Sequence, residues 1–150
     1  MKTIFDNAIR EELIQRIRLV DKDAKPEWGK MNVYQMVKHN SFWNGWVTGI
    51  DKHIYKQEIL GKIFGKYALN KMIKDEKPFD KNIPTSDQFK IKEFNGNIDA
   101  EKNKWIELVN EYRHFDNPNF IHDFFGRMTV EQIGILAYKH TDHHLRQFGV

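Results

Sequence analysis

The sequence predicts an all-α protein: a bundle of four long helices with an extra short helix between the second and the third. Apolar residues recur at three- and four-residue spacing in five segments, which is the period of a helix with one buried face. Strand-like alternation is confined to residues 89–92, which are too few to define a strand. A long connection containing Pro78 and Pro84 follows the short helix, and we expect it to cross between the two ends of the bundle.

Composition limits the class of protein. A chain of 150 residues, 40% of them hydrophobic, is expected to form one domain, residues 1–150, with a substantial core. The net charge is +3 and the lysines are interleaved with acids, so no basic stripe predicts nucleic-acid binding. The chain has no apolar run as long as a membrane span and no signal-peptide pattern, so we expect a cytoplasmic protein with no membrane partner. Because cysteine is absent, any transition-metal site must use histidines and carboxylates.

The first helix is predicted from Thr3 to about Asp21. Thr3 and Asp6 form an N-terminal cap signal, and Arg10 is expected on the exposed face. The apolar stripe that should face the core is Ile4, Ala8, Ile9, Leu13, Ile17 and Val20.

The second helix is predicted from Asn32 to about Ile50. Asn32 can cap it, and Gln35 stands at the position that completes a capping box. Gly45 and Gly49 are poor helix formers, which favours close packing against a neighbour.

A shorter helix is predicted over residues 59–74, although Gly61 and Gly65 interrupt its pattern. Its role is open at this point: it covers the mouth of a pocket or it forms a dimer surface. The third long helix is predicted from residue 98 or 99 to residue 112. Its expected inner face is Trp105, Leu108, Val109 and Tyr112.

The last helix is predicted to begin after Thr129, a good N-cap with Gln132 at the matching position. Its expected stripe is Val130, Ile133, Gly134, Ala137, Thr141, Leu145 and Phe148. His140 and His144 lie four residues apart and therefore on one face, a spacing with which one helix can give two imidazoles to one metal ion. Two close imidazoles repel when protonated, and a shared cation removes that conflict.

His39 is the best candidate for a third ligand. It lies in the middle of the second helix beside Met36, Trp43 and Trp46, where an unpaired histidine is unfavourable. Three histidines around one ion with an open position are typical of catalytic zinc sites, and bundles form such sites from facing helices. The ligand set suits Zn, Ni, Co or Fe. A histidine-lined core without a metal is the alternative.

His143 is turned about 100° around the helix axis from His144. We expect it at the helix flank or against a group that orients a ligand. Asp142 is offset in the same way and is expected to be a surface acid.

The other histidines are expected away from the ion. His53 lies about four turns from His39, which is too far for the same site. His114 and His122 lie at loop ends, where we expect surface or loop-docking roles.

Several motifs resemble those of the DinB/YfiT-like superfamily of metalloenzymes. They are the run Met36-Val-Lys-His39, its Gly-Lys-Met entry, and a C-terminal His-x-x-x-His helix that ends in Leu-Arg-Gln-Phe-Gly. Within the superfamily the chain resembles a branch described as a domain of unknown function. The segments that carry this narrower resemblance are Gly29-Lys-Met31, Phe124-Phe-Gly126, Met128-Thr129 and residues 138–149.

The resemblance implies a four-helix up-down-down-up bundle, a metal site formed by His39, His140 and His144, and a homodimer. Characterised relatives include thiol transferases that use bacillithiol or mycothiol and mycothiol-dependent isomerases. In these proteins the metal is thought to lower the pKa of a bound thiol or water and so to make a nucleophile.

Two functions follow as hypotheses. The first is a metal-dependent enzyme, either a transferase that uses a low-molecular-weight thiol or a hydrolase, acting on small electrophiles. The second is a non-catalytic metal- or ligand-binding module for stress response or interaction, which a fourth protein ligand would favour. The residues that could line the pocket or orient a ligand are Asn40, Phe42, Trp43, Trp46, Asp142, His143, Arg146 and Gln147. Core packing is the alternative for the aromatic residues, Trp43 above all, and caps or surface ion pairs are the alternative for the polar ones.

Overall fold

The computed structural model describes residues 1–50 and 54–150. These residues form helices and no strand, apart from one isolated bridge between His122 and Gly126, so the predicted all-α class is confirmed. The helices are α1 (Asn7–Leu19), α2 (Val33–Thr48), α3 (Ile59–Ile73), the short η1 (Asp87–Phe89), α4 (Ile98–Glu111), the short η2 (Tyr112–His114) and α5 (Val130–Gln147). None of the described helices is long and apolar enough to span a membrane. The expectation for His53 falls outside the described residues.

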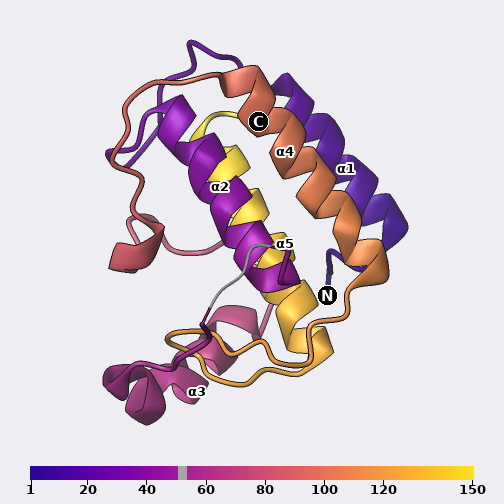
Figure 1. The fold of residues 1–150 in the computed structure, drawn as a ribbon, viewed down its shortest axis with the longest axis vertical. Coiled ribbons are helices and arrows are strands. Elements are labelled where there is room, and N and C mark those ends of the chain that lie inside the picture. Colours follow the sequence, from indigo (N-terminus) through magenta and orange to yellow (C-terminus); the bar gives the residue numbers. More distant parts are fainter. Residues whose placement is uncertain (51–53) are drawn as a thin grey trace.

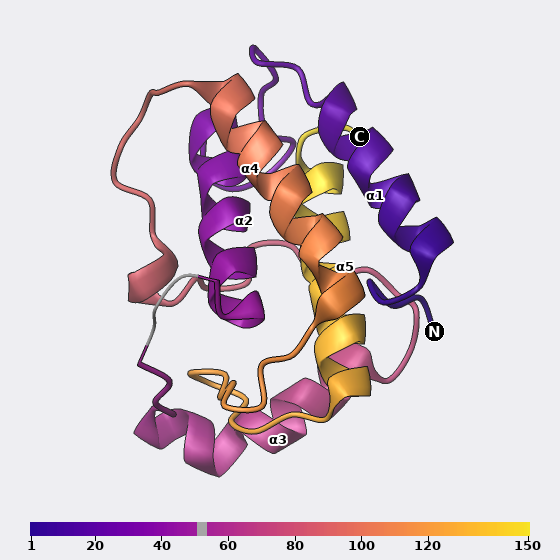
Figure 2. The same ribbon diagram turned by 45° about the vertical axis from the view of Figure 1, so that its right-hand side comes forward.

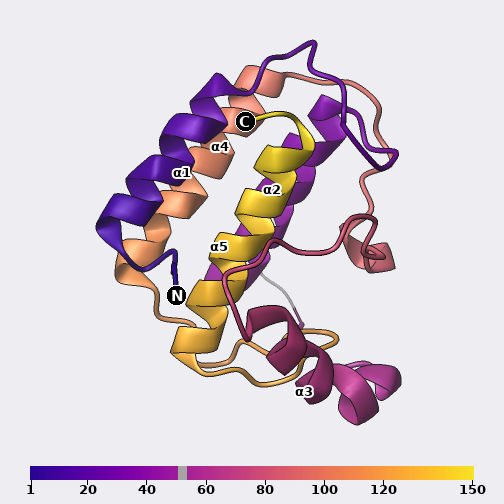
Figure 3. The ribbon, with the colours of Figure 1, turned by 180° about the vertical axis from the view of Figure 1, so that it is seen from behind.

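Four helices lie side by side, and α3 lies across one end of them (Figures 1 and 2). In Figure 1, α1 and α5 run upward and α2 and α4 run downward. The connection from α3 to α4 returns along the outside of the molecule to the far end, as predicted, and Figure 3 shows it passing α5 and α2. This path brings residues between α3 and α4 against the helices that carry the candidate histidines.

Two of the predicted helix starts are confirmed in detail. Asn32 and Gln35 form a capping box at the start of α2, and Thr129 and Gln132 form another at the start of α5. α2 ends earlier than predicted because Gly49 adopts the left-handed conformation, with φ of 78°, that terminates a helix.

The start predicted for the first helix is wrong. Asp6, not Thr3, is the N-cap of α1, and its Oδ1 accepts a hydrogen bond from the amide of Ile9. Arg10, expected to be exposed, is buried because its guanidinium donates to the carbonyl oxygens of the two residues that precede Asp6. These carbonyls turn inward before the helix begins and accept from Nη1 of the guanidinium inside the protein, while its Nε has no hydrogen-bond partner in the described structure.

The inner face predicted for α4 is confirmed, since Trp105, Leu108, Val109 and Tyr112 are all buried. In the stripes predicted for the first and last helices, two positions are instead exposed: Ala8 in the first turn of α1 and Val130 at the first position of α5. Each lies at the end of its helix, where the neighbouring helices no longer cover it.

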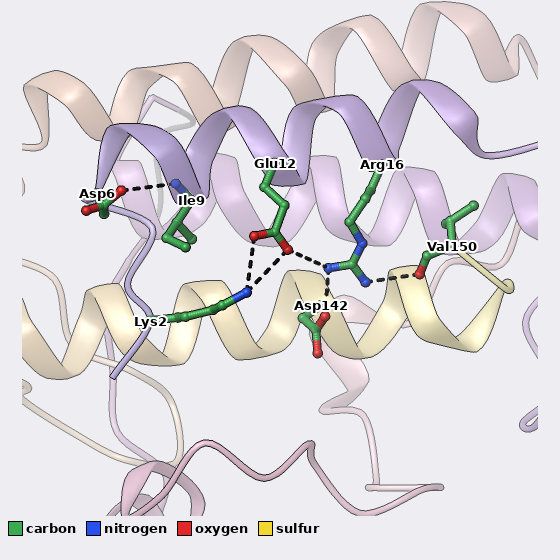
Figure 4. Close-up of polar contacts among 7 residues, drawn as sticks. All are labelled: Lys2, Asp6, Ile9, Glu12, Arg16, Asp142 and Val150. Carbon is green, nitrogen blue, oxygen red and sulfur yellow. Dashed lines mark hydrogen bonds and ion pairs between the residues drawn. The ribbon is translucent and has the colours of Figure 1, made fainter.

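A polar seam joins α1 to α5 (Figure 4). Arg16 of α1 pairs with Asp142 of α5 at 2.7 Å and donates to the carbonyl oxygen of Val150. Lys2 and Glu12 extend the seam with an ion pair of 3.1 Å. Asp142 is therefore a partly buried, paired carboxylate, and its partner Arg16 lies on α1.

α3 sits directly on the loop that precedes α5. Gly61 and Gly65 both face the backbone of Phe124, and a Cβ at either position would clash with its carbonyl oxygen. The two glycines that seemed to interrupt the helix are thus the residues that let it pack so closely. The opposite face of α3 is apolar and exposed, and it consists of Ile59, Leu60, Ile63, Phe64 and Tyr67.

Candidate metal centre

His39 of α2 meets His140 and His144 of α5 in the interior of the protein. One ring nitrogen from each residue lies within 4.8 Å of the other two, an arrangement that can hold a metal ion. His39 and His144 are buried, and His140 keeps part of its surface exposed. The antiparallel neighbours α2 and α5 bring the three rings together from positions far apart in the sequence.

Hydrogen bonds assign the proton positions of two of these rings. Nδ1 of His39 lies 2.9 Å from the carbonyl oxygen of Phe89, so it must donate its proton there. The amide Nε2 of Gln147 donates to the carbonyl oxygen of Trp28, which leaves its Oε1 to accept from Nδ1 of His144 at 2.9 Å. Both Nε2 atoms therefore carry a free lone pair, which is the form that binds metal.

The third ring, His140, fits the same ion. Its Nε2 lies 3.2 Å from Nε2 of His39, and zinc–nitrogen bonds of about 2.0–2.1 Å give a tetrahedral nitrogen–nitrogen distance of about 3.3 Å. Its ring stacks on Trp43 with centroids 4.2 Å apart. Its Nδ1 is buried without a partner in the described structure, so no hydrogen bond from this atom fixes the tautomer of the ring.

Burial keeps the cluster neutral. Desolvation lowers the pKa of His39, and it lowers the pKa values of His140 and His144 well below the ordinary value. The charges of the neighbouring imidazoles lower the last two pKa values further. Neutral imidazoles are ready ligands at neutral pH and need lose no proton to bind a cation.

Metal-free protein is expected to lose stability in weak acid. The folded pKa values of His39, His140 and His144 are lowered, so the unfolded chain binds more protons once the pH falls below about 6.5. The free energy of unfolding is therefore at its full value above that pH. Below it, this free energy falls by up to about 1.4 kcal/mol per pH unit for each histidine. Urea unfolding of chelator-treated protein from about pH 7.5 to about pH 5 measures this slope.

The control for that titration is the exposed His114. His140→Asn should make the slope shallower, whereas His114→Asn should leave it unchanged. A profile that is flat in the wild type would contradict the burial of three neutral imidazoles.

A cavity of about 480 Å³ opens onto the three histidines. Its walls come from α2, α3, α5, the connection between α3 and α4, and the loop before α5. Ala68 and Met72 of α3 line it, so this helix covers the cavity while its outer face stays exposed. Most of the lining is aromatic or aliphatic, and the described lining residues include the acids Glu58 and Asp123 but no lysine or arginine.

The aromatic candidates divide between cavity and core. Trp43 lines the cavity as well as stacking on His140. Trp46 is buried against Phe89 and Phe120 and is not among the described lining residues. Phe42 is also absent from the described lining.

The polar candidates divide more sharply. Gln147 holds His144, as described above. Asn40 donates to the carbonyl oxygen of Met36 within its own helix. Arg146 is exposed, and Asp142 belongs to the seam with α1, so neither lies against a ligand ring.

His143 lies outside the cluster but inside the protein. Its ring meets Trp28 and Phe79 at centroid distances of 5.5 and 6.0 Å, and it lines the cavity. Burial lowers its pKa. The helix flank expected for this residue is therefore a covered one.

The sequence interpretation missed His122 and Asp123. His122 was expected at a surface or docked loop, but it is buried and lines the cavity together with Asp123, whereas His114 is exposed as expected. Nδ1 of His122 lies 2.8 Å from Oδ1 of Asp123, and Oδ2 of Asp123 accepts from Gln88 at 2.7 Å. An adjacent His-Asp pair within an aromatic-rich loop was the signal available in the sequence.

Comparison with known protein families gives a match to one family. The sequence profile of a family described as "Protein of unknown function (DUF1569)" matches residues 6–149. No curated protein and no solved structure matches the chain. The matched residues extend from the N-cap of α1 to just beyond α5 and include all three clustered histidines. The chain therefore belongs to the DUF1569 family.

Proposed function

We propose that this protein binds one divalent metal ion through His39, His140 and His144 and acts as a metal-dependent transferase or hydrolase on small electrophiles. The observation that carries the proposal is the pair of fixed tautomers. The Phe89 carbonyl and the Gln147 side chain leave lone pairs on Nε2 of His39 and Nε2 of His144, whose ring centroids lie 4.9 Å apart. Without a cation, the hydrogen-bond partner within reach of the His39 lone pair among the described residues is the third ring, whose Nε2 lies 3.2 Å away.

An open coordination position supports the enzyme over the non-catalytic module. Within the described part of the chain, no fourth histidine or carboxylate joins the cluster, and the cavity reaches all three rings. Catalytic sites of this kind keep a position for water or substrate. A bound ion there supplies a Lewis acid that lowers the pKa of a water or thiol.

We also propose that the protein descends from the same ancestor as the DinB/YfiT-like superfamily. Helices that run up, down, down and up, with three histidines between α2 and α5, support membership of the DinB/YfiT-like superfamily. An experimental structure with bound zinc tests the metal site on which this membership rests, since an ion bound away from the three rings would contradict that site.

The direct test of the proposed function is metal content. Untagged protein dialysed against zinc, nickel or cobalt is expected to retain about one ion per chain. Elemental analysis gives the stoichiometry, and the visible spectrum of the cobalt form reports a low coordination number. Protein that retains no divalent ion under these conditions would contradict the proposal.

The lining of the cavity narrows the substrate screen. An apolar surface that offers no cation in its described part favours an uncharged electrophile, such as an aromatic epoxide or a chlorinated aromatic. Screening these compounds with a thiol and with water separates transferase from hydrolase. Metal-loaded protein that is inactive across both sets would favour the binding module.

The exposed apolar face of α3 supports the homodimer expected from the resemblance. This face consists of Ile59, Leu60, Ile63, Phe64 and Tyr67. Analytical ultracentrifugation is expected to show a dimer in the wild type and a monomer in Phe64→Glu. Lys62→Glu, at an exposed position that helix periodicity places outside this apolar face, should remain dimeric. A monomeric wild type would contradict this part of the proposal.

A further inference from the structure

The cavity contains a second polar group that the metal site does not use, the pair His122–Asp123. Nδ1 of His122 lies 2.8 Å from Oδ1 of Asp123, and the amide nitrogens of Phe124 and Phe125 lie 3.2 and 3.3 Å from the same Nδ1. The carboxylate contact is the shortest of the three, and two acceptor atoms that close require a proton between them, so we place the proton on Nδ1, which donates it to Asp123. In the neutral ring the lone pair is then on Nε2. The same carboxylate accepts from the amide of Phe124 at 2.8 Å and from Gln88 at 2.7 Å, so its own position is fixed from two segments.

Burial raises the pKa of the Asp123 carboxyl, but hydrogen bonds and charge from His122, with further bonds from Ser86 and Gln88, outweigh it and lower the pKa to about 2. The group is thus a carboxylate throughout the neutral range. A carboxylate held against one nitrogen of an imidazole fixes its tautomer and stabilises the protonated ring, which is how orienting acids act on catalytic histidines.

Nε2 of His122 is the ring nitrogen that remains accessible from the cavity. It has no hydrogen-bond partner among the described residues, yet it is not one of the fully buried unpaired atoms. Since His122 lines the cavity, this nitrogen is open to whatever occupies it. The ring itself is held rigidly against Trp46 and Phe125, with centroids 5.2 and 4.4 Å away.

We propose that His122, oriented by Asp123, is the proton acceptor of this cavity for an uncharged nucleophile that carries an S–H or O–H group. The inference rests on the proposed function and adds a residue to it. Nε2 takes the proton, and the electrons of the S–H or O–H bond stay on the nucleophile as a lone pair that attacks an electrophilic carbon. When an epoxide is the electrophile, its carbon–oxygen bond breaks, and the oxygen takes the proton back from His122, which returns to its neutral form.

The three clustered histidines cannot take this role because, in the proposed function, their lone pairs bind the ion. The described lining leaves His143 as the other free imidazole. Its ring lies against Trp28, Phe79 and His144, and no hydrogen bond or ion pair joins it to a carboxylate among the described residues. This makes His143→Asn the matched control for His122→Asn.

Proton counting tests the proposal without a known substrate. Zinc-loaded protein is titrated at neutral pH with 2-mercaptoethanol, an uncharged thiol, by calorimetry in buffers that differ in ionisation enthalpy. Thiolate absorbance in the ultraviolet shows whether the thiol ionises on binding. If His122 accepts the proton, the wild type and His143→Asn release almost none to the buffer, whereas His122→Asn releases about one per thiol. Asp123→Asn should also release more than the wild type.

The outcomes separate the two levels of inference. Equal proton release by wild type and His122→Asn, with thiolate formed in both, overturns the role of His122 and leaves the proposed function standing. Zinc-loaded wild type that forms no thiolate overturns the role of His122 for thiols, and a wild type that binds no zinc overturns both inferences. Zinc content and thermal melting confirm that each variant is folded. Nitrogen-15 NMR of the imidazoles in wild-type protein gives an independent check, because a neutral His122 with its proton on Nε2 overturns the proposal whatever the variants do.

Discussion

Replacing any one of the three clustered histidines with alanine is expected to abolish stable zinc binding. Structural zinc binding at neutral pH amounts to roughly 10–16 kcal/mol over four ligands, or about 3–4 kcal/mol for each. His39→Ala, His140→Ala and His144→Ala should therefore each raise the dissociation constant by roughly 10²–10³-fold. Competition with a chromophoric chelator measures this change.

His143→Ala is the matched control, because it removes the adjacent buried imidazole of the same helix without touching the cluster. It should retain zinc with affinity close to that of the wild type. Loss of zinc in His143→Ala but not in His144→Ala would show that the face of α5 is wrongly assigned.

Gln147→Leu should fall between these limits. Its side chain fixes the tautomer of His144 and the position of the Trp28 carbonyl, but it does not reach the ion. Loss of such a supporting hydrogen bond typically weakens metal binding by about 10–100-fold. The proposed geometry thus predicts the largest loss of zinc affinity for the ligand variants, a smaller loss for Gln147→Leu and almost none for His143→Ala. A nonspecific loss of folding would not produce this order.

Much of the helical framework was predictable because its signals are local. The capping boxes at Asn32 and Thr129 each depend on two residues three positions apart. Helix periodicity alone places His140 and His144 on one face. His39 could be predicted as the third ligand because it lies in the middle of another helix of the bundle. These are the parts of the site that regular structure determines.

The remaining parts depend on irregular segments, whose path no periodicity describes. The carbonyl of Phe89 reaches His39 because the chain crosses between the ends of the bundle and turns at η1. His122 and Asp123 enter the cavity because a bridge to Gly126 folds the loop back on itself. Arg10 is buried for a similar reason: carbonyl oxygens that lie outside α1 accept hydrogen bonds from its guanidinium and so reduce the free-energy cost of burying it.

Gly65→Ala is expected to destabilise the protein, the reverse of the usual effect of this substitution. In an exposed helix the change stabilises by roughly 1 kcal/mol, because alanine restricts the unfolded chain and favours helix. Here the added Cβ would meet the carbonyl oxygen of Phe124, and the Cα of Phe125 would lie 3.1 Å away. These are backbone atoms that cannot rotate aside, so α3 must move, at a cost of about 1–3 kcal/mol.

Urea unfolding of Gly65→Ala beside Asn70→Ala, an exposed position of the same helix, measures the difference. The second variant should be neutral or slightly stabilised. Hydrogen exchange adds the functional consequence: α3 lifted from the loop should lose protection in its own amides and in the amide of Glu58, which donates to the carbonyl oxygen of Asp123. Because Asp123 orients His122 and α3 covers the cavity, a single methyl group at Gly65 is expected to disturb both the wall and the proton acceptor while leaving the three zinc ligands on α2 and α5 in place. A stabilised Gly65→Ala would show instead that α3 does not rest on the loop.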